Sequence, residues 1–166
     1  MIRPGEDSDL IDVGALHARS RASAYSRILP PAALAGFPAG AMGEYWVERW
    51  RYEREDHQLT VAEADGDLLG FTYLGPDEEP GVGILNAIHV APEAVGQGVG
   101  RALMLDALDK LTARGWSRAV LWVLAANARA RRFYERGGWA LDGAERVEYF
   151  GPVAVPQVRY ARLLTP

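Results

Sequence analysis

The sequence predicts an α/β (α+β) fold: a mixed, mostly antiparallel sheet of six to seven strands, flanked by about four helices. Two observations support this prediction. Between residues 57 and 90, short apolar segments are separated by turn-forming residues, which is typical of consecutive antiparallel strands. Over residues 82–124, an apolar strand-like run is followed by a helical pattern and a second apolar run. This order predicts a central strand–helix–strand crossover that joins two parallel strands.

The first third of the chain is expected to be mainly helical. Asp7 or Ser8 precedes a helical spacing of apolar residues, and a short polar side chain at that place is the usual helix cap. Residues 29–43 are rich in Pro, Gly and Ala, a composition that favours a turn, a short helix and a loop. The regular elements expected here are a strand at 2–6 and helices at 9–25 and 44–55.

From residue 57 onward the pattern indicates strands and two further helices. HQLTVAEA and LLGFTYLG flank the turn ADGD and predict a hairpin. SRAVLWVL is almost entirely apolar, as expected of a parallel strand that is buried on both faces. The elements expected in this part are strands at 57–64, 68–75, 82–90, 117–124, 139–150 and 155–164, and helices at 98–115 and 127–138.

The composition is that of one globular domain spanning residues 1–166. Hydrophobic residues make up 49% of the chain and charged residues 24%. The formal net charge of −4 argues against a nucleic-acid partner, because domains that bind nucleic acids are usually basic. The absence of cysteine excludes disulfides, thiolate metal sites and a cysteine nucleophile.

Neither a metal site nor a membrane segment is expected. His17, His57 and His89 are scattered and form no HxH or HxxxH pair. The N-terminal segment lacks the apolar core of a signal peptide, and no run approaches the ~18 apolar residues of a membrane span. We therefore expect a cytoplasmic protein without a membrane partner.

A glycine-rich loop stands between the first strand of the crossover and its helix. In IHVAPEAVGQGVGRALMLDAL, residues 88–108, the glycines are Gly96, Gly98 and Gly100. A helix N-terminus offers unpaired N–H donors and a positive dipole end, and glycine lets a pyrophosphate approach them closely. Arg101 adds a cation in the first turn. The loop is therefore a candidate pyrophosphate site, with a plain glycine-rich turn as the alternative.

Two nucleotide-binding motifs do not fit this loop. A phosphate-binding P-loop needs a Gly-Lys pair, which the chain lacks. A dinucleotide fingerprint needs GxGxxG and an acidic residue about 20 positions later, whereas the loop reads GxGxG and the next strand, AVLWVL, has no acid. The pyrophosphate of another carrier and a loop without a ligand remain as interpretations.

A second motif lies downstream in WVLAANARARRFYERGGW, residues 122–139, where Asn127, Ala130, Phe133 and Tyr134 have a fixed spacing. Together the two stretches resemble the GCN5-related N-acetyltransferase (GNAT) family. The family's loop reads Gln/Arg-x-x-Gly-x-Gly/Ala, and its second motif reads Asn-x-x-Ala-x-x-(Leu/Phe)-Tyr, followed by an acidic-basic-x-Gly-(Phe/Trp) tail. The order of elements is also similar along the whole chain, so the resemblance implies a GNAT-like sheet.

The residue-level resemblance covers residues 82–139 and departs from the family at one position. Val95 stands where the family has Gln or Arg at the start of the loop. A polar side-chain contact to the pyrophosphate is therefore missing. The other contacts in the loop come from backbone N–H groups, which any residue can supply. This departure puts the affinity for the carrier in doubt more than its identity.

The resemblance implies that acetyl-CoA is the co-substrate. The backbones of Ile88 and Val90 would pair with the pantetheine arm, and one of their N–H groups would stabilise the developing oxyanion. Tyr134 would be the catalytic acid that protonates the leaving thiolate. The residues expected to bind acetyl-CoA are Ile88, His89, Val90, Val95, Gly96, Gln97, Gly98, Val99, Gly100, Arg101, Asn127, Ala130 and Phe133.

The expected activity is transfer of the acetyl group to a primary amine by direct attack, on a small-molecule or peptide acceptor that the sequence does not identify. The position where some relatives carry a glutamate base is Ile84. Asn86, His89 and Glu63 are nearby polar candidates, and no base is assigned. A non-catalytic acyl-CoA-binding sensor of the same fold is the alternative, and a homodimer stays open. The candidate acceptor residues are Tyr25, Phe37, Glu44, Trp46, Glu48, Trp50, Glu148 and Tyr149.

Overall fold

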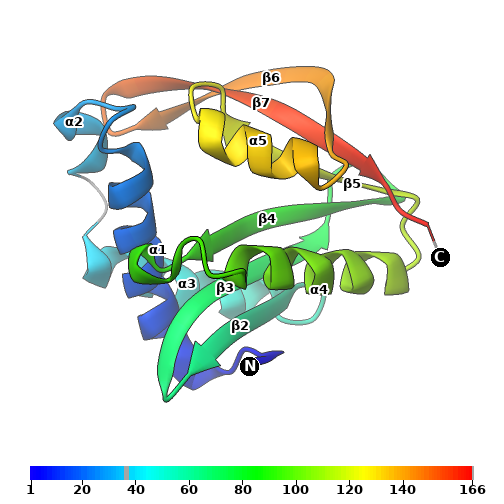
Figure 1. Cartoon of the computed structure of the whole chain (residues 1–166), viewed down its shortest axis with the longest axis horizontal. Coiled ribbons are helices and arrows are strands. Elements are labelled where there is room, and N and C mark those ends of the chain that lie inside the picture. Colours follow the sequence, from blue (N-terminus) through cyan, green and yellow to red (C-terminus); the bar gives the residue numbers. More distant parts are fainter. Residues whose placement is uncertain (36–37, 166) are drawn as a thin grey trace.

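A computed structural model describes residues 1–35 and 38–165 of the chain, so Phe37 lies outside the described residues. Within them, seven strands form one sheet in the order β1-β2-β3-β4-β5-β7-β6 (Figure 1). The strands are β1 (Ile2–Pro4), β2 (Gln58–Ala64), β3 (Asp67–Pro76), β4 (Val82–Val90), β5 (Arg118–Leu124), β6 (Ala140–Phe150) and β7 (Val153–Leu163). The helices are α1 (Leu10–Tyr25), α2 (Pro31–Leu34), α3 (Ala39–Glu53), α4 (Val99–Ala113) and α5 (Ala128–Arg136), with 3-10 turns at Asp7–Asp9 and Pro92–Ala94.

The sheet confirms the predicted fold class. β4 and β5 are parallel and are joined by α4, and the other neighbouring strands are antiparallel. In Figure 1, α4 and α5 lie in front of the sheet and α3 lies behind it. The four α4 residues with helical apolar spacing face inward and are at most 9% exposed: Leu103, Ala107, Leu108 and Leu111. No helix among the described residues is both long and apolar enough to cross a membrane.

Two hydrophobic clusters fill the two faces of the sheet. On the α1/α3 face, Leu16 and Trp46 pack with Phe71 of β3. On the α4/α5 face, Leu111 and Tyr134 belong to a cluster that also contains the inward residues of β5. Burial of these large apolar groups is the main term that holds the helices to the sheet.

The prediction for the segment before residue 44 was wrong in two respects. Helix α3 begins at Ala39, directly after Pro38, and therefore includes the glycines that the sequence pattern assigned to a loop. A Cβ atom on Gly14 of α1 would lie 2.3 Å from the backbone N of Gly43. The backbones of the two helices are therefore in direct contact where they cross. Gly14 and Gly43 allow this close packing and do not form a turn.

The second difference is the cap of the first helix. Neither Asp7 nor Ser8 caps it: Glu6 and Asp9 form a reciprocal capping box around the preceding 3-10 turn, and the Glu6 N–H donates to Asp9 Oδ2 at 2.8 Å. The Asp7 carboxylate instead accepts hydrogen bonds from the side chains of Trp50 and Arg54. Asp7 was therefore a wrong prediction for the cap, because its carboxylate binds side chains of α3 and of the residue after it instead.

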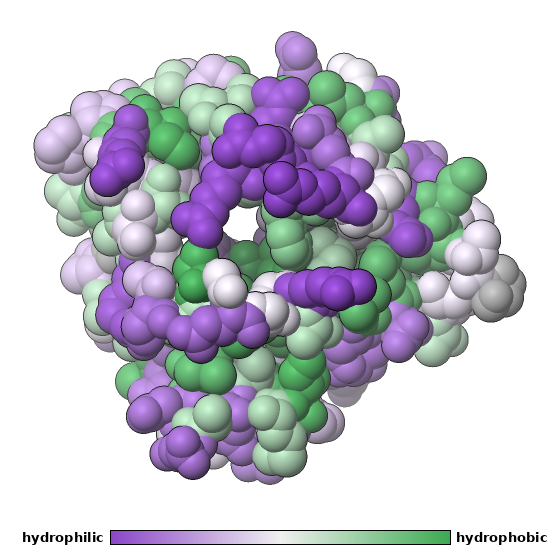
Figure 2. Space-filling model, in the orientation of Figure 1, coloured by the Kyte–Doolittle hydropathy of each residue, from purple (hydrophilic) through white to green (hydrophobic). Residues whose placement is uncertain are grey.

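The central feature of the sheet is an opening between β4 and β5. The two strands pair only where Val82–Ile84 faces Arg118–Val120. Beyond that point β4 continues beside β3 as far as Val90, and β5 continues beside β7 as far as Leu124. Figure 2 shows an opening in this region, bordered above by hydrophilic side chains. Each of the two strands therefore presents one unpaired backbone edge to the opening.

Candidate active site

The open edge of β4 carries backbone donors that face away from β3. The Ala91 N–H donates to Leu69 O at the β3 side, at 2.8 Å. Because backbone groups alternate along a strand, the N–H of His89 points to the same side. The N–H groups of Ile88 and Val90 therefore face the opening. These are the two residues that the sequence predicted to pair with an extended ligand.

The glycine loop places further backbone donors at the start of α4. Gly98 caps the helix in the left-handed region, at a φ of 86°, which favours glycine. The first helical bond runs from Ala102 N to Gly98 O at 3.1 Å. The N–H groups of Val99, Gly100 and Arg101 precede it and therefore have no partner in the helix. This is the arrangement of donors that an anion site at a helix N-terminus requires.

The remaining loop residues differ in exposure and contacts. Val95 is 41% exposed, so its side chain lies at the surface of the loop. Gly96 also has a left-handed φ, of 84°. The Gln97 side chain turns back and donates to Glu93 O at 3.1 Å. Arg101 is exposed.

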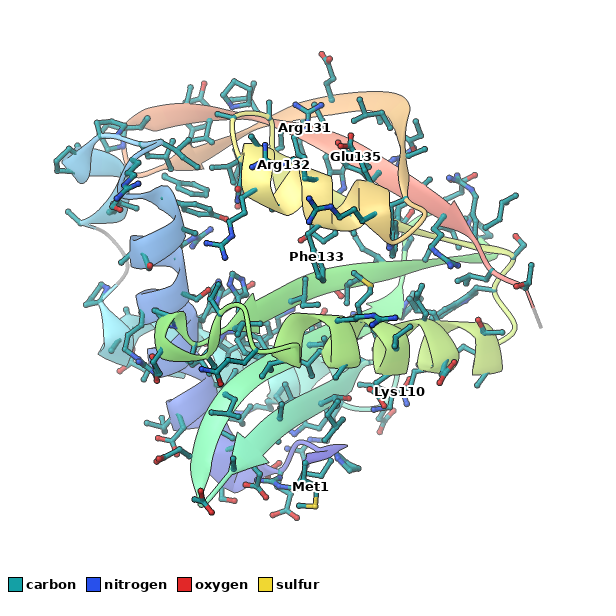
Figure 3. All side chains as sticks on the ribbon, in the orientation of Figure 1. Met1, Lys110, Arg131, Arg132, Phe133 and Glu135 are labelled. Atoms are coloured by element: carbon teal, nitrogen blue, oxygen red, sulfur yellow. The ribbon has the colours of Figure 1, made fainter. Side chains whose placement is uncertain are left out.

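The loop and α5 meet beside β4. A Cβ atom on Gly100 would lie 3.5 Å from Val90 Cγ2 and 3.6 Å from Phe133 Cζ. Figure 3 shows Phe133 pointing from α5 toward β4 and α4. Ala130, one turn earlier, packs against the cluster of the α4/α5 face. The structure thus brings the glycine loop and the second motif together, as their predicted roles in one binding site require.

Asn127 caps α5 as predicted. Its Oδ1 accepts a hydrogen bond from the Ala130 N–H at 3.2 Å, and the residue is only 9% exposed. The side-chain amide N–H₂ is a separate donor that this bond does not use. A contact between that amide and a ligand in the opening remains a prediction.

Tyr134 differs from two other buried tyrosines in its hydrogen bonding. The Tyr73 hydroxyl donates to Glu53 Oε1 at 3.0 Å, and the Tyr160 hydroxyl donates to Glu135 Oε2 at 2.9 Å. Among the described residues, the Tyr134 hydroxyl has no hydrogen-bond partner, although its residue is only 8% exposed. Its ring is held in place while its proton is available.

Burial determines the protonation state of Tyr134. It raises the pKa of Tyr134, and Tyr25 at the end of α1 adds to the rise. The phenol is therefore neutral at pH 7 and carries a proton that it can give away.

His89 has its ring on the α1 side of β4. The ring stacks with Phe71 at 5.5 Å and lies 4.3 Å from His17, and Nδ1 is 3.0 Å from Ser20 Oγ. Burial lowers the pKa of His89 to about 3 and that of His17 to about 2. Both imidazoles are neutral at pH 7. The Trp46 indole N–H donates to His17 Nδ1 at 3.0 Å, which fixes one tautomer.

A cavity of about 380 Å³ opens on the α1/α3 face of the sheet, where β4 and β5 begin to separate. Sequence reasoning missed it, because its walls come from α3, the β3–β4 loop and the five strands β3 to β7, with no shared motif. The lining of the cavity includes Arg49, Ile84, Asn86, Trp122, Arg146 and Arg159.

The predicted acceptor residues within the described ranges 1–35 and 38–165 do not line this cavity. Trp46 is a core residue at 1% exposure, and Trp50 donates to Asp7 Oδ1 at 2.9 Å. Tyr149 is 68% exposed on β6. Of the polar base candidates, Glu63 is held by Arg3 at 3.0 Å beside β1, and only Asn86 borders the cavity.

The chain matches one protein family and is similar in sequence to several known proteins. The model of the acetyltransferase (GNAT) family matches residues 24–139. An uncharacterised N-acetyltransferase of Archaeoglobus fulgidus is 37% identical over 91 residues, or 52% of this chain and 62% of that protein. A mycothiol acetyltransferase of Beutenbergia cavernae is 45% identical over 82 residues, or 49% of this chain and 27% of that protein. The chain thus spans less than two thirds of either relative.

The fold is also that of a solved acetyltransferase. The crystal structure of the PaiA N-acetyltransferase from Thermoplasma acidophilum, in complex with coenzyme A, superposes with a TM-score of 0.79. The match covers 98% of each chain at 18% sequence identity. At that identity the likeness concerns the fold.

Proposed function

The chain belongs to the acetyltransferase (GNAT) family, and from this premise we propose that it transfers an acetyl group from acetyl-CoA to a primary amine. The observation that carries the proposal is the Tyr134 hydroxyl, which belongs to a buried residue of α5 and has no hydrogen-bond partner among the described residues. A purely structural tyrosine in a core normally has its hydroxyl bonded, as in Tyr73 and Tyr160.

The binding of acetyl-CoA is proposed to use backbone donors for most polar contacts. The N–H groups of Val99, Gly100 and Arg101 would hold the pyrophosphate, with the Arg101 side chain beside it. The open edge at Ile88 and Val90 would pair with the amides of the pantetheine arm as an added strand would. Acetyl-CoA supplies the activated acetyl group as a thioester.

The proposed chemistry is direct attack by the amine. The nitrogen attacks the thioester carbonyl carbon, the carbon–sulfur bond breaks, and Tyr134 gives its proton to the departing sulfur. An N–H on the open edge of β4 stabilises the negative charge that develops on the carbonyl oxygen. The nitrogen releases one proton to water and the tyrosine regains its proton from water, so the products are an amide and a free thiol.

Burial affects both partners in the proton transfer. It raises the pKa of Tyr134 because a phenolate is poorly solvated there. A thiolate formed at the same place is destabilised for the same reason, so it is a stronger base than in water. The transfer from oxygen to sulfur therefore stays favourable enough to assist departure of the thiol.

A non-catalytic acyl-CoA sensor of the same fold is the competing function. Val95 favours it, because a missing polar contact at the pyrophosphate is tolerable for a protein that need not turn over rapidly. Neither Ile84 nor the neutral His89 is an evident base, which also fits a sensor. The unbonded Tyr134 hydroxyl favours the enzyme, since a sensor needs no proton donor at the sulfur.

The test is an acceptor screen with acetyl-CoA, in which thiol release and the mass of the acetylated product are both measured. We expect amine-dependent thiol release with at least one acceptor class. Acetyl-CoA should also raise the melting temperature by mass action, whereas NAD and ATP should not. Stabilisation by acetyl-CoA without product from any amine class would support the sensor, and equal stabilisation by NAD would overturn the choice of co-substrate.

A further inference from the structure

The cavity on the α1/α3 face is where an amine can reach the end of the proposed pantetheine track. On the opposite face, Leu85 and Leu121 pack into the α4/α5 cluster, which closes that route. On the α1/α3 face, Ile84 and Asn86 of β4 and Trp122 of β5 line the cavity. The cavity therefore borders both diverging strands just beyond their last paired residues.

One wall of this cavity is an aromatic ring with two arginines over it. The guanidinium carbon of Arg146 lies 4.3 Å from the centre of the Trp122 ring, and that of Arg159 lies 5.6 Å from it. In the sheet, Arg159 is the β7 partner of Trp122, and Arg146 is the β6 partner of Gln157. Stacking on a ring orients a guanidinium while its in-plane N–H groups stay free to bind an anion.

Of the three cavity arginines, Arg146 alone has no hydrogen bond to a carboxylate among the described residues. Arg159 donates to Asp142 Oδ2 at 2.6 Å, and Arg49 donates to Glu53. Arg146 instead donates from Nε to the neutral Gln157 Oε1 at 2.6 Å. Its ion pair with Glu148 is long, with Nη2 and Oε2 3.9 Å apart, beyond hydrogen-bond distance.

The partner of Arg146 is itself fixed. Gln157 is 6% exposed, and its Nε2 donates to Glu148 Oε2 at 2.8 Å, which turns its Oε1 toward the arginine. Desolvation lowers the pKa of Arg146, and the attraction of Glu148 offsets only part of this effect. The terminal N–H groups of Arg146 are thus prepared for an anion from outside.

We propose that Arg146 binds a carboxylate of the acceptor, so that the amine substrate is amino-acid-like or a peptide with an acidic group near its amine. This proposal rests on the acetyl transfer proposed above and names its substrate class. Asp77 and Glu78 on the β3–β4 loop also line the cavity. They repel a carboxylate and attract an ammonium, so the cavity favours an acceptor whose anionic end lies at Arg146.

The experiment compares acceptors that differ only in a carboxylate. One arm uses amino acids and their carboxamides, and the other uses dipeptides with Glu or Gln in second position. Wild-type protein is compared with Arg146→Met, which keeps a long side chain over Trp122 without charge, and with Arg159→Met as the matched control. Taking the ratio between proteins for each pair cancels differences in amine basicity. Affinity for acetyl-CoA is measured for all three.

For the wild type, we expect kcat/KM to be about 10- to 100-fold higher for the carboxylate member of at least one pair, the scale of a charge-assisted hydrogen bond. Arg146→Met should abolish this preference mainly by raising the KM of the carboxylate member, with unchanged affinity for acetyl-CoA. Arg159→Met should retain the preference, since that guanidinium is already bonded to Asp142. A preference among the amino acids would identify the acceptor as a free amino acid, and a preference among the dipeptides would identify it as a peptide.

Equal kcat/KM within every pair for the wild type would overturn the proposal, and so would a preference that survives Arg146→Met. If no amine is acetylated at all, the proposed function fails separately. The subsite is then judged by calorimetry with the same pairs on the CoA-bound protein. Tighter binding of the carboxylate member that depends on Arg146 would support the anion subsite, and equal binding would overturn it.

Discussion

The two sides of the β4–β5 opening are built in different ways. The side toward α4 and α5 comes from one continuous stretch, residues 88–134, and offers mainly backbone N–H groups. The side toward α1 and α3 comes from α3, the β3–β4 loop and strands β3 to β7, and offers mainly side chains. A ligand shared by many relatives can be held by backbone, whereas a choice among acceptors requires side chains. The difference suggests that changes on the first side affect the common reaction and changes on the second affect selectivity.

The largest expected effect lies at Tyr134, on the side toward α4 and α5. Tyr134→Phe keeps the ring and removes the one transferable proton, so kcat should fall by roughly 10²–10⁴ while affinity for acetyl-CoA changes little. The decrease should be smaller with a more acidic thiol leaving group, which needs less help. Steady-state kinetics and calorimetry on the same preparation measure both quantities.

Tyr160→Phe is the matched control for this change. The Tyr160 hydroxyl is bonded to Glu135 and Arg131, so its loss should lower the free energy of unfolding and leave turnover per folded molecule near normal. Unchanged turnover in Tyr134→Phe would remove Tyr134 from the mechanism and favour the sensor.

The second prediction concerns the backbone side alone. Gly98→Asp places a carboxylate beside the proposed pyrophosphate, and we expect the dissociation constant of acetyl-CoA to rise by about 100-fold or more through charge repulsion. Gly66→Asp is the control, because Gly66 in the β2–β3 turn has nearly the same φ, 83° against 86°, and an equally open Cβ position. Both variants should lose similar stability. Equal affinity for acetyl-CoA in the two would show that the loop is only a turn.

The third prediction concerns the side toward α1 and α3, where His17 is buried and His89 is half-buried. His17 and His89 have pKa values lowered from 6.5 to about 2 and about 3 by burial, with Arg21 adding to both. As the pH falls below 6.5, the unfolded chain binds protons that the folded protein excludes, so the free energy of unfolding decreases. The stabilisation is complete above about pH 7 and is lost progressively toward the folded pKa values.

Denaturant unfolding between about pH 7 and pH 5 measures this effect, above the range in which carboxylates titrate. The slope should average about 2 kcal/mol per pH unit, because each of the two imidazoles contributes up to about 1.4. His89→Phe should flatten it, because only one buried imidazole then remains. A free energy of unfolding that is constant down to about pH 5 would contradict the burial of both rings.

The smallest effect is expected at the edge of the glycine loop. Val95→Arg adds a cation at a position that is 41% exposed, and should tighten acetyl-CoA binding by about 1 kcal/mol. Val147→Arg on β6, which is 55% exposed, is the control for a general effect of added charge. Weaker binding in Val95→Arg would mean that residue 95 does not face the ligand.

Local patterns sufficed for the elements that lie close together in the chain. The hairpin, the crossover and the Asn127 cap were predicted correctly, since alternation, apolar runs and caps depend on neighbouring residues. The start of α3 and the cap of α1 were wrong. Both depend on the packing of α1 against α3, where Gly43 meets Gly14 and Asp7 meets Trp50.

The sequence by itself determined the fold class, the glycine loop and the second motif at residues 122–139. Each of them depends on residue types and spacings within short stretches of the chain. Only the tertiary structure decided that the Tyr134 hydroxyl is unbonded and that Trp122, Arg146 and Arg159 share one wall. Both features depend on strand register and on the point where β4 and β5 separate. Strand register brings together residues that are far apart in the chain. No local sequence pattern encodes such a register, so the cavity on the α1/α3 face could be recognised only in the complete sheet.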